Sequence, residues 1–236
     1  MTPRSYDAAK RATDIAVSAA VLAAAAPVGA VIAWRIRRED GGPVIFRGIR
    51  VGRGGGTFDI LKFRTMSVGA ERLGVDATAD SDPRLTRIGR VLRRWKLDEL
   101  PQLVNVLRGE MSLVGPRPQM VWDVERYTAE ERRLLDIRPG ITDWASIKYR
   151  RQGTLIEGHP DPQAAYFELI RPGKMELAMA YLRSRSYGVD LGILGLTALA
   201  VLGYPRTDEL LSRMVTASSA RSSSARPSSG RSSARD

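Results

Sequence analysis

A long apolar stretch lies near the start of the chain. Residues Ile15 to Trp34 carry no charged side chain. At ~1.5 Å per residue, about twenty helical residues span ~30 Å, which matches the hydrocarbon core of a bilayer. A secretory signal peptide is an alternative explanation, but the run is long and Trp34-Arg35 follows it in place of a clear cleavage site. The pattern therefore predicts a membrane helix.

Two features distinguish this helix from a simple membrane span. Ala26-Pro27 lies well inside the run, and proline removes a helical hydrogen bond and kinks the helix. Both flanks are basic, and positive flanks favour the cytoplasmic side. We therefore expect a re-entrant helix that bends at Ala26-Pro27, although a single span with an incidental proline fits the same pattern. The flanking cations are Arg4, Lys10, Arg11, Arg35, Arg37 and Arg38.

Short elements follow the membrane helix and predict an α+β fold. Residues 44–66 contain two β-prone runs separated by glycine-rich residues 52–56, which is typical of a hairpin. Residues 84–95 place apolar side chains at helical spacing among five arginines. This pattern predicts a basic amphipathic helix that suits a membrane surface, and nucleic-acid binding is the competing interpretation of the same charges.

Further helices are expected toward the C-terminus. One begins near Pro101 and ends near Gly109, because proline suits a first helical turn and glycine suits a helix end. Residues 173–187 have helical periodicity, and residues 191–202 form an apolar run too short to span a bilayer. From about Ala217 the chain is rich in Ser, Ala and Arg, which is typical of disorder. The expected organisation is a membrane helix over residues 1–40, a folded domain over 41–205 and a disordered basic tail over 206–236.

The charge balance indicates an anionic partner. The chain has 37 Lys plus Arg against 26 Asp plus Glu, a formal net charge of +11. Nucleic acid, an acidic lipid surface and a polyphosphate substrate all fit this excess. The absence of Cys excludes disulfide and thiolate chemistry, and His159 is the only histidine. A metal would therefore need oxygen ligands, which favours Mg2+ or Mn2+.

The adjacent carboxylates Asp98 and Glu99 are the strongest candidates for chemistry. They precede Pro101, so both would lie at a helix N-terminus, where negative charge is favoured. Capping alone can account for such a pair. The alternative is a metal and phosphate site, because a divalent cation relieves the repulsion between neighbouring carboxylates. One carboxylate can then attack phosphorus while the other holds the ion.

Three cationic segments favour the phosphate site. Lys62 and Arg64 end the predicted hairpin, Arg117 lies between two prolines, and Arg138 precedes Pro139-Gly140. A stiff loop that presents arginine suits phosphate oxygens, because the guanidinium donates in a planar fork. Each segment alone is weak evidence, since prolines beside an arginine are usually plain turns.

In this order, the segments resemble the bacterial sugar transferase family, the small monotopic phosphoglycosyl transferases. The resemblance runs from about residue 8 to residue 203, and residues 97–118 are its most diagnostic part. The matching segments are Lys10-Arg11 with Asp14, Ala26-Pro27, Pro43–Phe46, Lys62–Met66, Asp82–Thr86, Leu92–Arg94, Leu97–Gln102, Gly109–Pro118 and Arg138–Thr142.

The resemblance implies a reaction. Such enzymes transfer a sugar phosphate from a nucleotide sugar, usually a UDP-sugar, to polyprenyl (undecaprenyl) phosphate in the first membrane step of a surface glycan pathway. By this analogy Asp98 is the nucleophile, which expels UMP and forms a covalent phosphosugar-aspartate. Glu99 would bind Mg2+, with Mn2+ as the alternative ion.

The resemblance also implies binding roles and a location. Lys62 and Arg117 would contact the substrate phosphates, and Arg93 would meet the lipid phosphate or headgroups. Arg64 and Arg138 are expected in the same phosphate- and lipid-binding set. The broken helix would be re-entrant, with the protein on the cytoplasmic face of the inner membrane.

One segment departs from the family pattern. After Thr142 the family commonly continues Gly-Trp and Ala-Gln-Val with a nearby Gly-Arg, whereas here Asp143–Ser146 is followed by Arg150-Arg151. This region helps to shape the nucleotide-sugar end of the site, so the sugar is left open. A membrane-anchored basic binding protein is the competing function, but it does not explain an acidic pair among rigid arginine loops. Anionic lipids are therefore expected as partners, and nucleic acid is not.

Overall fold

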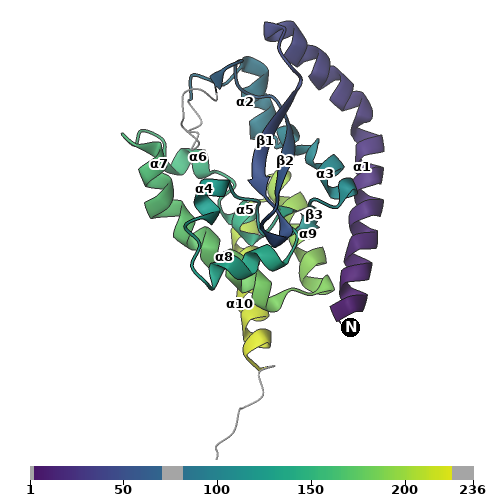
Figure 1. Ribbon diagram of the computed structural model, residues 1–236, viewed down its shortest axis with the longest axis vertical. Coiled ribbons are helices and arrows are strands. Elements are labelled where there is room, and N and C mark those ends of the chain that lie inside the picture. The colour runs from purple at the N-terminus through teal and green to yellow at the C-terminus, as the bar shows by residue number, and fades with distance from the viewer. Residues whose placement is uncertain (1–2, 71–81, 225–236) are drawn as a thin grey trace, which may run out of the picture.

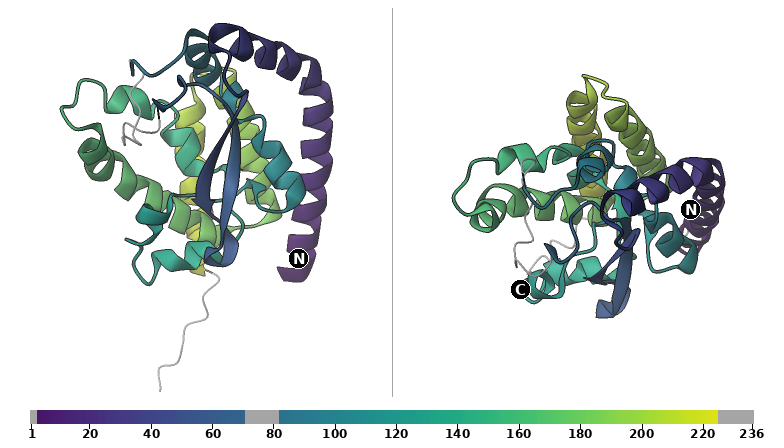
Figure 2. Two further views of the ribbon diagram at one scale, coloured as in Figure 1. Left: turned by 45° about the horizontal axis from the view of Figure 1, so that its top comes forward. Right: turned by 90° about the horizontal axis from the view of Figure 1, so that it is seen from above.

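The N-terminal helix is the longest element of the protein. The computed structural model describes residues 3–70 and 82–224. Helix α1 (Pro3–Asp40) runs along one edge of the molecule and contains Pro27 (Figure 1). Figure 2 shows that its second half turns over the top of the domain, as expected for a helix with an internal proline. By length and composition α1 could cross a membrane, and only 11% of its most apolar window is buried.

Polar residues of α1 fasten it to the rest of the protein. Arg11 donates from Nη1 to the carbonyl of Val106 at 2.6 Å and from Nη2 to that of Leu107 at 2.9 Å. Asp14 is 4% exposed, and its Oδ1 accepts the backbone amide of Leu113 at 3.0 Å. The charged residues at the start of this apolar helix therefore have a structural role.

The α+β class is confirmed. Strands β1 (Ile45–Val51) and β2 (Thr57–Phe63) form the expected antiparallel hairpin, with Ile45 opposite Phe63. The 3₁₀ turn η1 (Arg53–Gly55) closes the hairpin, and Gly54 and Gly55 adopt positive φ there. A second, parallel pair consists of β3 (Ser112–Val114) and β4 (Gly140–Thr142).

The two helices expected around the acidic pair are present. Helix α2 (Arg87–Arg94) is capped by Thr86, whose hydroxyl accepts the amide of Gly89 at 2.9 Å. Its outward side includes Val91, which is 50% exposed, and Trp95 follows at 53% exposed. Helix α3 (Gln102–Arg108) follows Pro101 and ends at Gly109, where φ is +83°.

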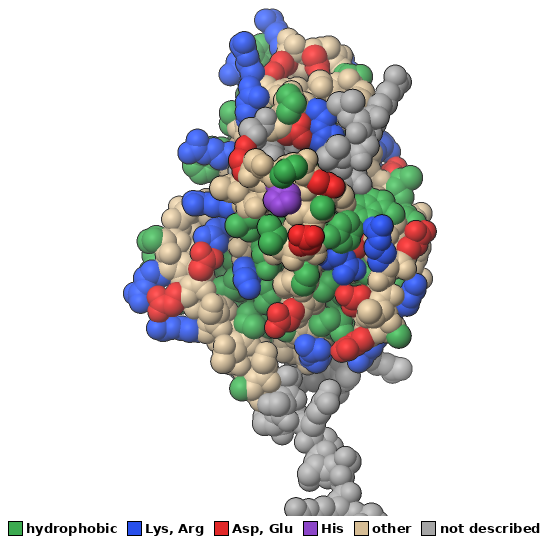
Figure 3. All heavy atoms as spheres, turned by 90° about the vertical axis from the view of Figure 1, so that its left-hand side faces the viewer, with side chains coloured by type: hydrophobic (Ala, Val, Ile, Leu, Met, Phe, Trp, Pro, Cys, Tyr) green, Lys and Arg blue, Asp and Glu red, His purple; other side chains and the backbone are tan. Residues whose placement is uncertain are grey.

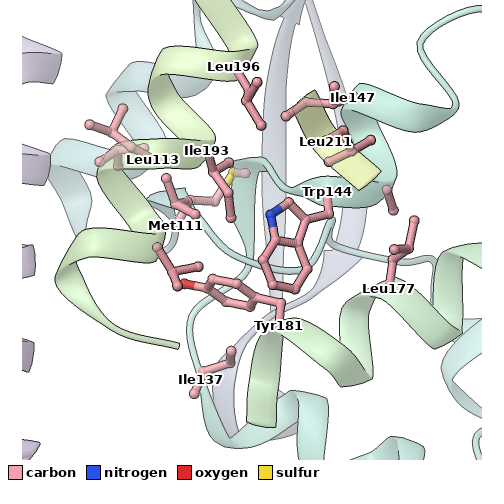
Figure 4. Packing of buried hydrophobic residues seen from close by; sticks show 14 of the residues in the cluster. Met111, Leu113, Ile137, Trp144, Ile147, Leu177, Tyr181, Ile193, Leu196 and Leu211 are labelled. Atoms are coloured by element: carbon pink, nitrogen blue, oxygen red, sulfur yellow. The ribbon is translucent and has the colours of Figure 1, made fainter. Parts of the chain in front are cut away.

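Packed helices form most of the remaining domain. Trp144, on α5, is fully buried and meets Tyr181 of α8 edge-on with ring centroids 6.1 Å apart. Figure 4 shows both rings surrounded by aliphatic side chains from several elements (Figure 4). The elements are α4 (Val121–Val124), η4 (Glu131–Asp136), α5 (Trp144–Lys148), α6 (Gln152–Leu155), α7 (Pro162–Ala165), the π-helix η5 (Tyr166–Ile170), α8 (Arg171–Ser184), α9 (Tyr187–Val201) and α10 (Thr207–Ser224).

Helix α10 corrects the expected tail. Residues 207–224 are helical, so disorder from residue 206 is wrong for this stretch. Leu211 is 3% exposed and joins the main core, with Leu210, Met214 and Val215 packed around it. These side chains recur at helical spacing and give α10 an apolar face. The expectation for residues 225–236 lies outside the described residues.

The surface around α6 and α7 carries charges of both signs beside apolar side chains (Figure 3). His159, the purple side chain of that view, is exposed there.

Candidate active site

The acidic pair lies in a tight turn between two helices. Asp98 and Glu99 belong to the 3₁₀ turn η3 (Leu97–Glu99), directly before Pro101 and α3. The preceding residue, Lys96, has a φ of +56°, the one positive φ of a non-glycine residue in the described chain. Left-handed backbone is uncommon for a lysine and recurs at functional sites. This reversal between α2 and η3 sets the direction in which the carboxylates enter the domain.

Two cations from distant segments meet the acidic pair. The Nη2 atom of Arg117 lies 2.6 Å from Oε1 of Glu99, and the same oxygen is 3.2 Å from Nζ of Lys62. Lys62 Nζ is also 3.7 Å from Oδ2 of Asp98. The structure therefore brings together four of the residues that the sequence singled out.

The two carboxylates have different environments. Burial raises the pKa of Asp98, which is 6% exposed, and Lys62 only partly opposes that shift. Burial acts in the same direction on Glu99, but the charges of Arg117 and Lys62 outweigh it and hold the pKa of Glu99 well below its usual range. Oδ1 of Asp98 is buried and accepts no hydrogen bond from the described residues. Neighbouring carboxylates with opposed environments are suited to separate chemical roles.

A buried amide holds this turn against the hairpin. Asn105 on α3 is fully buried. Its Oδ1 accepts the amide of Leu61 at 3.0 Å, and its Nδ2 donates to the carbonyl of Asp59 at 2.8 Å. Helix α3 and strand β2 are thereby fixed to each other, which places Lys62 opposite the acidic pair.

Three other arginines named from the sequence have different surroundings. Arg64 is buried and forms a bidentate pair with Asp40 at the end of α1, and it also donates to the carbonyl of Pro43 at 2.6 Å. Arg138 donates to the carbonyl of Gly109 at 2.9 Å, at the end of α3. Both side chains help to hold the fold, and their place in the phosphate- and lipid-binding set stays a prediction. Arg93 lies on α2. The hydrogen bond from Arg84 is the main cause that lowers the pKa of Asp82, and the charge of Arg93 adds to it.

The altered segment after Thr142 lies near the site. Asp143 is 2% exposed, and its Oδ1 accepts the amide of Ser146 at the start of α5. The charge of Glu99 is the main cause that raises the pKa of Arg117, and the charge of Asp143 adds to it. Arg150 pairs with Asp208 of α10, so it is engaged at the α5–α10 contact.

Sequence reasoning missed two lysines, Lys96 beside the acidic pair and Lys174 near Arg117. Burial lowers the pKa of Lys96, and the charges of Glu99 and Arg117 act on it with opposite signs. Lys174 on α8 interacts electrostatically with Arg117 and Asp143. The position of Lys96 next to the pair was an available signal. Lys174 gave none, because only the packing of α5 against α8 brings it near.

The carboxylate oxygens fit a hard divalent cation. No group of three or more acidic or histidine ligands occurs among residues 3–70 and 82–224. Mg2+ commonly uses only one or two carboxylates and completes its shell with substrate phosphates and water. Oδ1 of Asp98 has no partner among the described residues, and the contact from Arg117 Nη1 to Oε2 of Glu99 is long, at 3.4 Å. These two oxygens are the ones that could hold the ion.

Known proteins share much of this sequence. Undecaprenyl-phosphate glucose phosphotransferase of Komagataeibacter xylinus is 40% identical over 199 residues, which cover 80% of this chain and 35% of that protein. UDP-glucose:undecaprenyl-phosphate glucose-1-phosphate transferase of Caulobacter vibrioides is 43% identical over 153 residues, covering 64% and 57%. EpsL of Bacillus subtilis, named as an uncharacterized sugar transferase, is 37% identical over 186 residues, which cover 78% of this chain and 83% of that protein. The chain thus spans less than two thirds of the first two proteins.

A family model covers more of this chain than the alignment with any of these three proteins does. The model of the family described as bacterial sugar transferase matches residues 5–204. This range begins inside α1, includes η3 and both cationic segments that meet it, and ends just beyond α9. The chain therefore belongs to the bacterial sugar transferase family.

Proposed function

We propose that the chain transfers a sugar phosphate from a nucleoside diphosphate sugar, in the first place a UDP-sugar, to polyprenyl phosphate. The observation that carries the proposal is the buried carboxylate of Asp98, whose Oδ1 has no partner among the described residues, beside the cations Lys62 and Arg117. A poorly solvated carboxylate next to cations is suited to attack a phosphorus atom that bears negative oxygens. The relatives named for sugar phosphate transfer to undecaprenyl phosphate support the same reaction class.

The first step forms a covalent intermediate. An oxygen of Asp98 attacks the phosphorus next to the sugar, and the bond from that phosphorus to the bridging oxygen breaks. The electron pair leaves with the nucleoside monophosphate, UMP for a UDP-sugar. A mixed anhydride, the phosphosugar-aspartate, remains on the enzyme.

The second step regenerates the free carboxylate of Asp98. A phosphate oxygen of the lipid attacks the same phosphorus, the bond to Asp98 breaks, and the product is a polyprenyl diphosphate sugar. Lys62 and Arg117 offset the negative charge that gathers as the two phosphates meet. Their contacts with Glu99 hold both cations in place before substrate enters.

Glu99 is the proposed ligand for Mg2+, with Oδ1 of Asp98 and substrate phosphate as further oxygens. When bound, such an ion polarises the phosphoryl oxygens and neutralises part of their charge. Mn2+ offers the same chemistry. Independently of the metal ion, Glu99 keeps Lys62 and Arg117 aligned through its contacts with both.

The location follows from α1 and the lipid acceptor. A helix that enters and leaves by one face would keep the acidic pair at the cytoplasmic surface of the inner membrane, where nucleotide sugars are found. The exposed Val91 and Trp95 beside the arginines of α2 suit contact with anionic lipid. Arg93 is the proposed contact for the lipid phosphate or headgroups.

A nucleotide-release assay tests the reaction. Purified protein is incubated with a panel of UDP-sugars and polyprenyl phosphate, and UMP release is measured. Asp98→Asn should abolish release with the accepted donor, because an amide is not a comparable nucleophile. The matched control, Asp136→Asn, changes an exposed aspartate and should keep wild-type activity.

Mass spectrometry tests the intermediate directly. Wild-type protein treated with donor in the absence of lipid should gain a sugar phosphate on Asp98. An adduct on another residue would reassign the nucleophile, and near-normal UMP release by Asp98→Asn would refute the covalent mechanism.

A further inference from the structure

Helix α1 ends in two acidic residues whose side chains both bind the rest of the domain. The carboxylate of Glu39 accepts the first two backbone amides of α2, with Oε1 2.6 Å from the nitrogen of Arg87 and Oε2 3.1 Å from that of Ile88. Free amides and the helix dipole favour a carboxylate at this end of a helix. The hydroxyl of Thr86 takes the next amide, that of Gly89, so Glu39 supplies the part of the cap that comes from outside α2.

The second acidic residue, Asp40, binds the other element that carries a residue of the site. It forms the bidentate pair with Arg64, which directly follows β2. Lys62 lies two residues before Arg64, so this pair fixes the end of the strand from which Lys62 reaches the acidic pair. The end of α1 thus holds both β2 and α2, the helix that leads into η3 (Figure 1).

An apolar cluster completes the connection between α1 and the acidic turn. It contains Ile36 of α1, which is 2% exposed, Leu92 of α2, which is 1% exposed, and Phe63, the last residue of β2. Leu97 and Leu100, directly before and after the acidic pair, pack against the same cluster. A shift of α2 relative to α1 would therefore move the residues that flank the two carboxylates.

We propose that Glu39 is a positioning residue for sugar phosphate transfer: by holding the start of α2 against the end of α1, it sets the place of Asp98 relative to Lys62. The inference rests on the proposed function. Oδ2 of Asp98 and Nζ of Lys62 lie 3.7 Å apart, and they come from the two elements that the end of α1 holds. Helix α1 thus contributes to the alignment of the site as well as to membrane attachment.

The rate at which the phosphosugar-aspartate forms separates positioning from a purely structural role. The full chain in detergent is mixed with a saturating UDP-sugar donor without lipid acceptor, and the adduct is followed over time by mass spectrometry. The final amount of adduct counts the folded sites, whereas the rate constant reports their alignment. A misplacement of 1 Å can cost about 100-fold in rate, and the loss of one exposed cap should displace α2 by less. Glu39→Ala should therefore lower the rate constant about 10-fold and leave the final amount unchanged.

Two further substitutions sharpen this measurement. Glu39→Gln keeps one acceptor oxygen, so its rate constant should fall between those of wild type and Glu39→Ala. Lys62→Met should slow adduct formation in wild type, because it removes the cation beside Asp98. In the Glu39→Ala background Lys62 is already misaligned, so Lys62→Met should have a smaller effect there. Strictly additive effects of the two substitutions would overturn the proposed link between Glu39 and Lys62.

Asp161 provides the matched control. Its Oδ1 accepts the amides of Gln163 and Ala164 at 2.9 and 3.0 Å, so it also caps a helix, α7, through two backbone amides. Helix α7 packs elsewhere, because its Ala165 belongs to another apolar cluster with Ile170. Asp161→Ala should remove a comparable cap and leave the rate constant of adduct formation unchanged.

Three other outcomes would overturn the positioning role. An unchanged rate constant in Glu39→Ala would show that the cap does not align the site. A loss confined to the final amount of adduct would mean that Glu39 only supports folding, and equal slowing in Asp161→Ala would mean that loss of any such cap slows the reaction. The proposed function fails separately, by a wild-type protein that forms no adduct on Asp98 or by an active Asp98→Asn variant, and the inference then falls with it.

Discussion

Gly115, directly after β3, and Gly140, the first residue of β4, touch backbone to backbone. A Cβ on Gly140 would lie 2.1 Å from the backbone nitrogen of Gly115, and one on Gly115 would lie 2.6 Å from the carbonyl oxygen of Arg138. The amide of Gly140 also donates to the carbonyl of Pro116 at 2.9 Å. Because Pro116 and Arg117 follow directly, this contact sets the loop that carries Arg117 to Glu99.

Gly140→Ala should therefore impair both stability and transfer. The added methyl group has no room beside backbone atoms, and overpacking of this kind costs about 1–3 kcal/mol. A displaced Arg117 should lower the rate of UMP release by on the order of 100-fold. Thermal unfolding and the release assay measure the two effects.

The matched control is Gly188→Ala on α9, where a Cβ would meet nothing within 4 Å. It should leave activity unchanged and stabilise the helix slightly, since alanine is the better helix former. Wild-type activity in Gly140→Ala would show that the loop tolerates a shift at this contact.

The main elements were predictable because local patterns specify them. The Pro101 start and the Gly109 end of α3 follow from proline and glycine geometry, and the structure has both. The roles of the arginines were harder to predict from the sequence. Arg117 and Arg138 both neighbour prolines, yet one reaches Glu99 and the other donates to the carbonyl of Gly109. The pairing of β3 with β4 decides which of the two arginines reaches Glu99, and this pairing joins residues that are far apart in sequence.

Helix α10 was missed for a related reason. Its sequence is rich in Ser and Ala, so its apolar face rests on few side chains, chiefly Leu210, Leu211 and Met214. Helices of this kind gain most of their stability from packing on the rest of the domain.

Leu211→Ala tests whether α10 is part of the folded domain. Leu211 is 3% exposed within the main core, so its truncation should cost about 2–5 kcal/mol and lower the unfolding temperature. Leu202→Ala changes a leucine that is 81% exposed and should be close to neutral. Equal, small effects of both substitutions would mean that α10 contributes little to the stability of the domain.

Lys174 should make stability depend on alkaline pH. Its folded pKa, about 8, lies below the ordinary lysine value of ~10.4, so between these values the unfolded chain holds more protons. Stability then rises with pH across this window, and Lys174→Met should remove that rise. The charged groups that act on the ammonium are Arg117, after β3, Lys96, before η3, Asp143, at the start of α5, and Asp123, on α4.

Unfolding curves of wild type and Lys174→Met at pH 7.5 and 10 provide the measurement. The variant should be the more stable of the two by a larger margin at the lower pH, because only there does wild type carry the buried charge. A margin that does not change with pH would mean that Lys174 titrates as an ordinary exposed lysine.

The bend in α1 should place both of its ends on one side of the membrane. The chain has no cysteine, so single cysteines can be introduced without a background reaction. Ala8→Cys and Arg37→Cys lie at exposed positions near the two ends of α1, and both should react with an impermeant maleimide from the cytoplasmic side. Val28→Cys, next to Pro27, is exposed on the protein but should stay unreactive because lipid covers it.

Replacing Pro27 with alanine restores the missing helical hydrogen bond and should shift labelling at one end to the opposite side. Opposite labelling of the two ends in the parent chain would instead establish a membrane span, and would leave Pro27 as a kink within it.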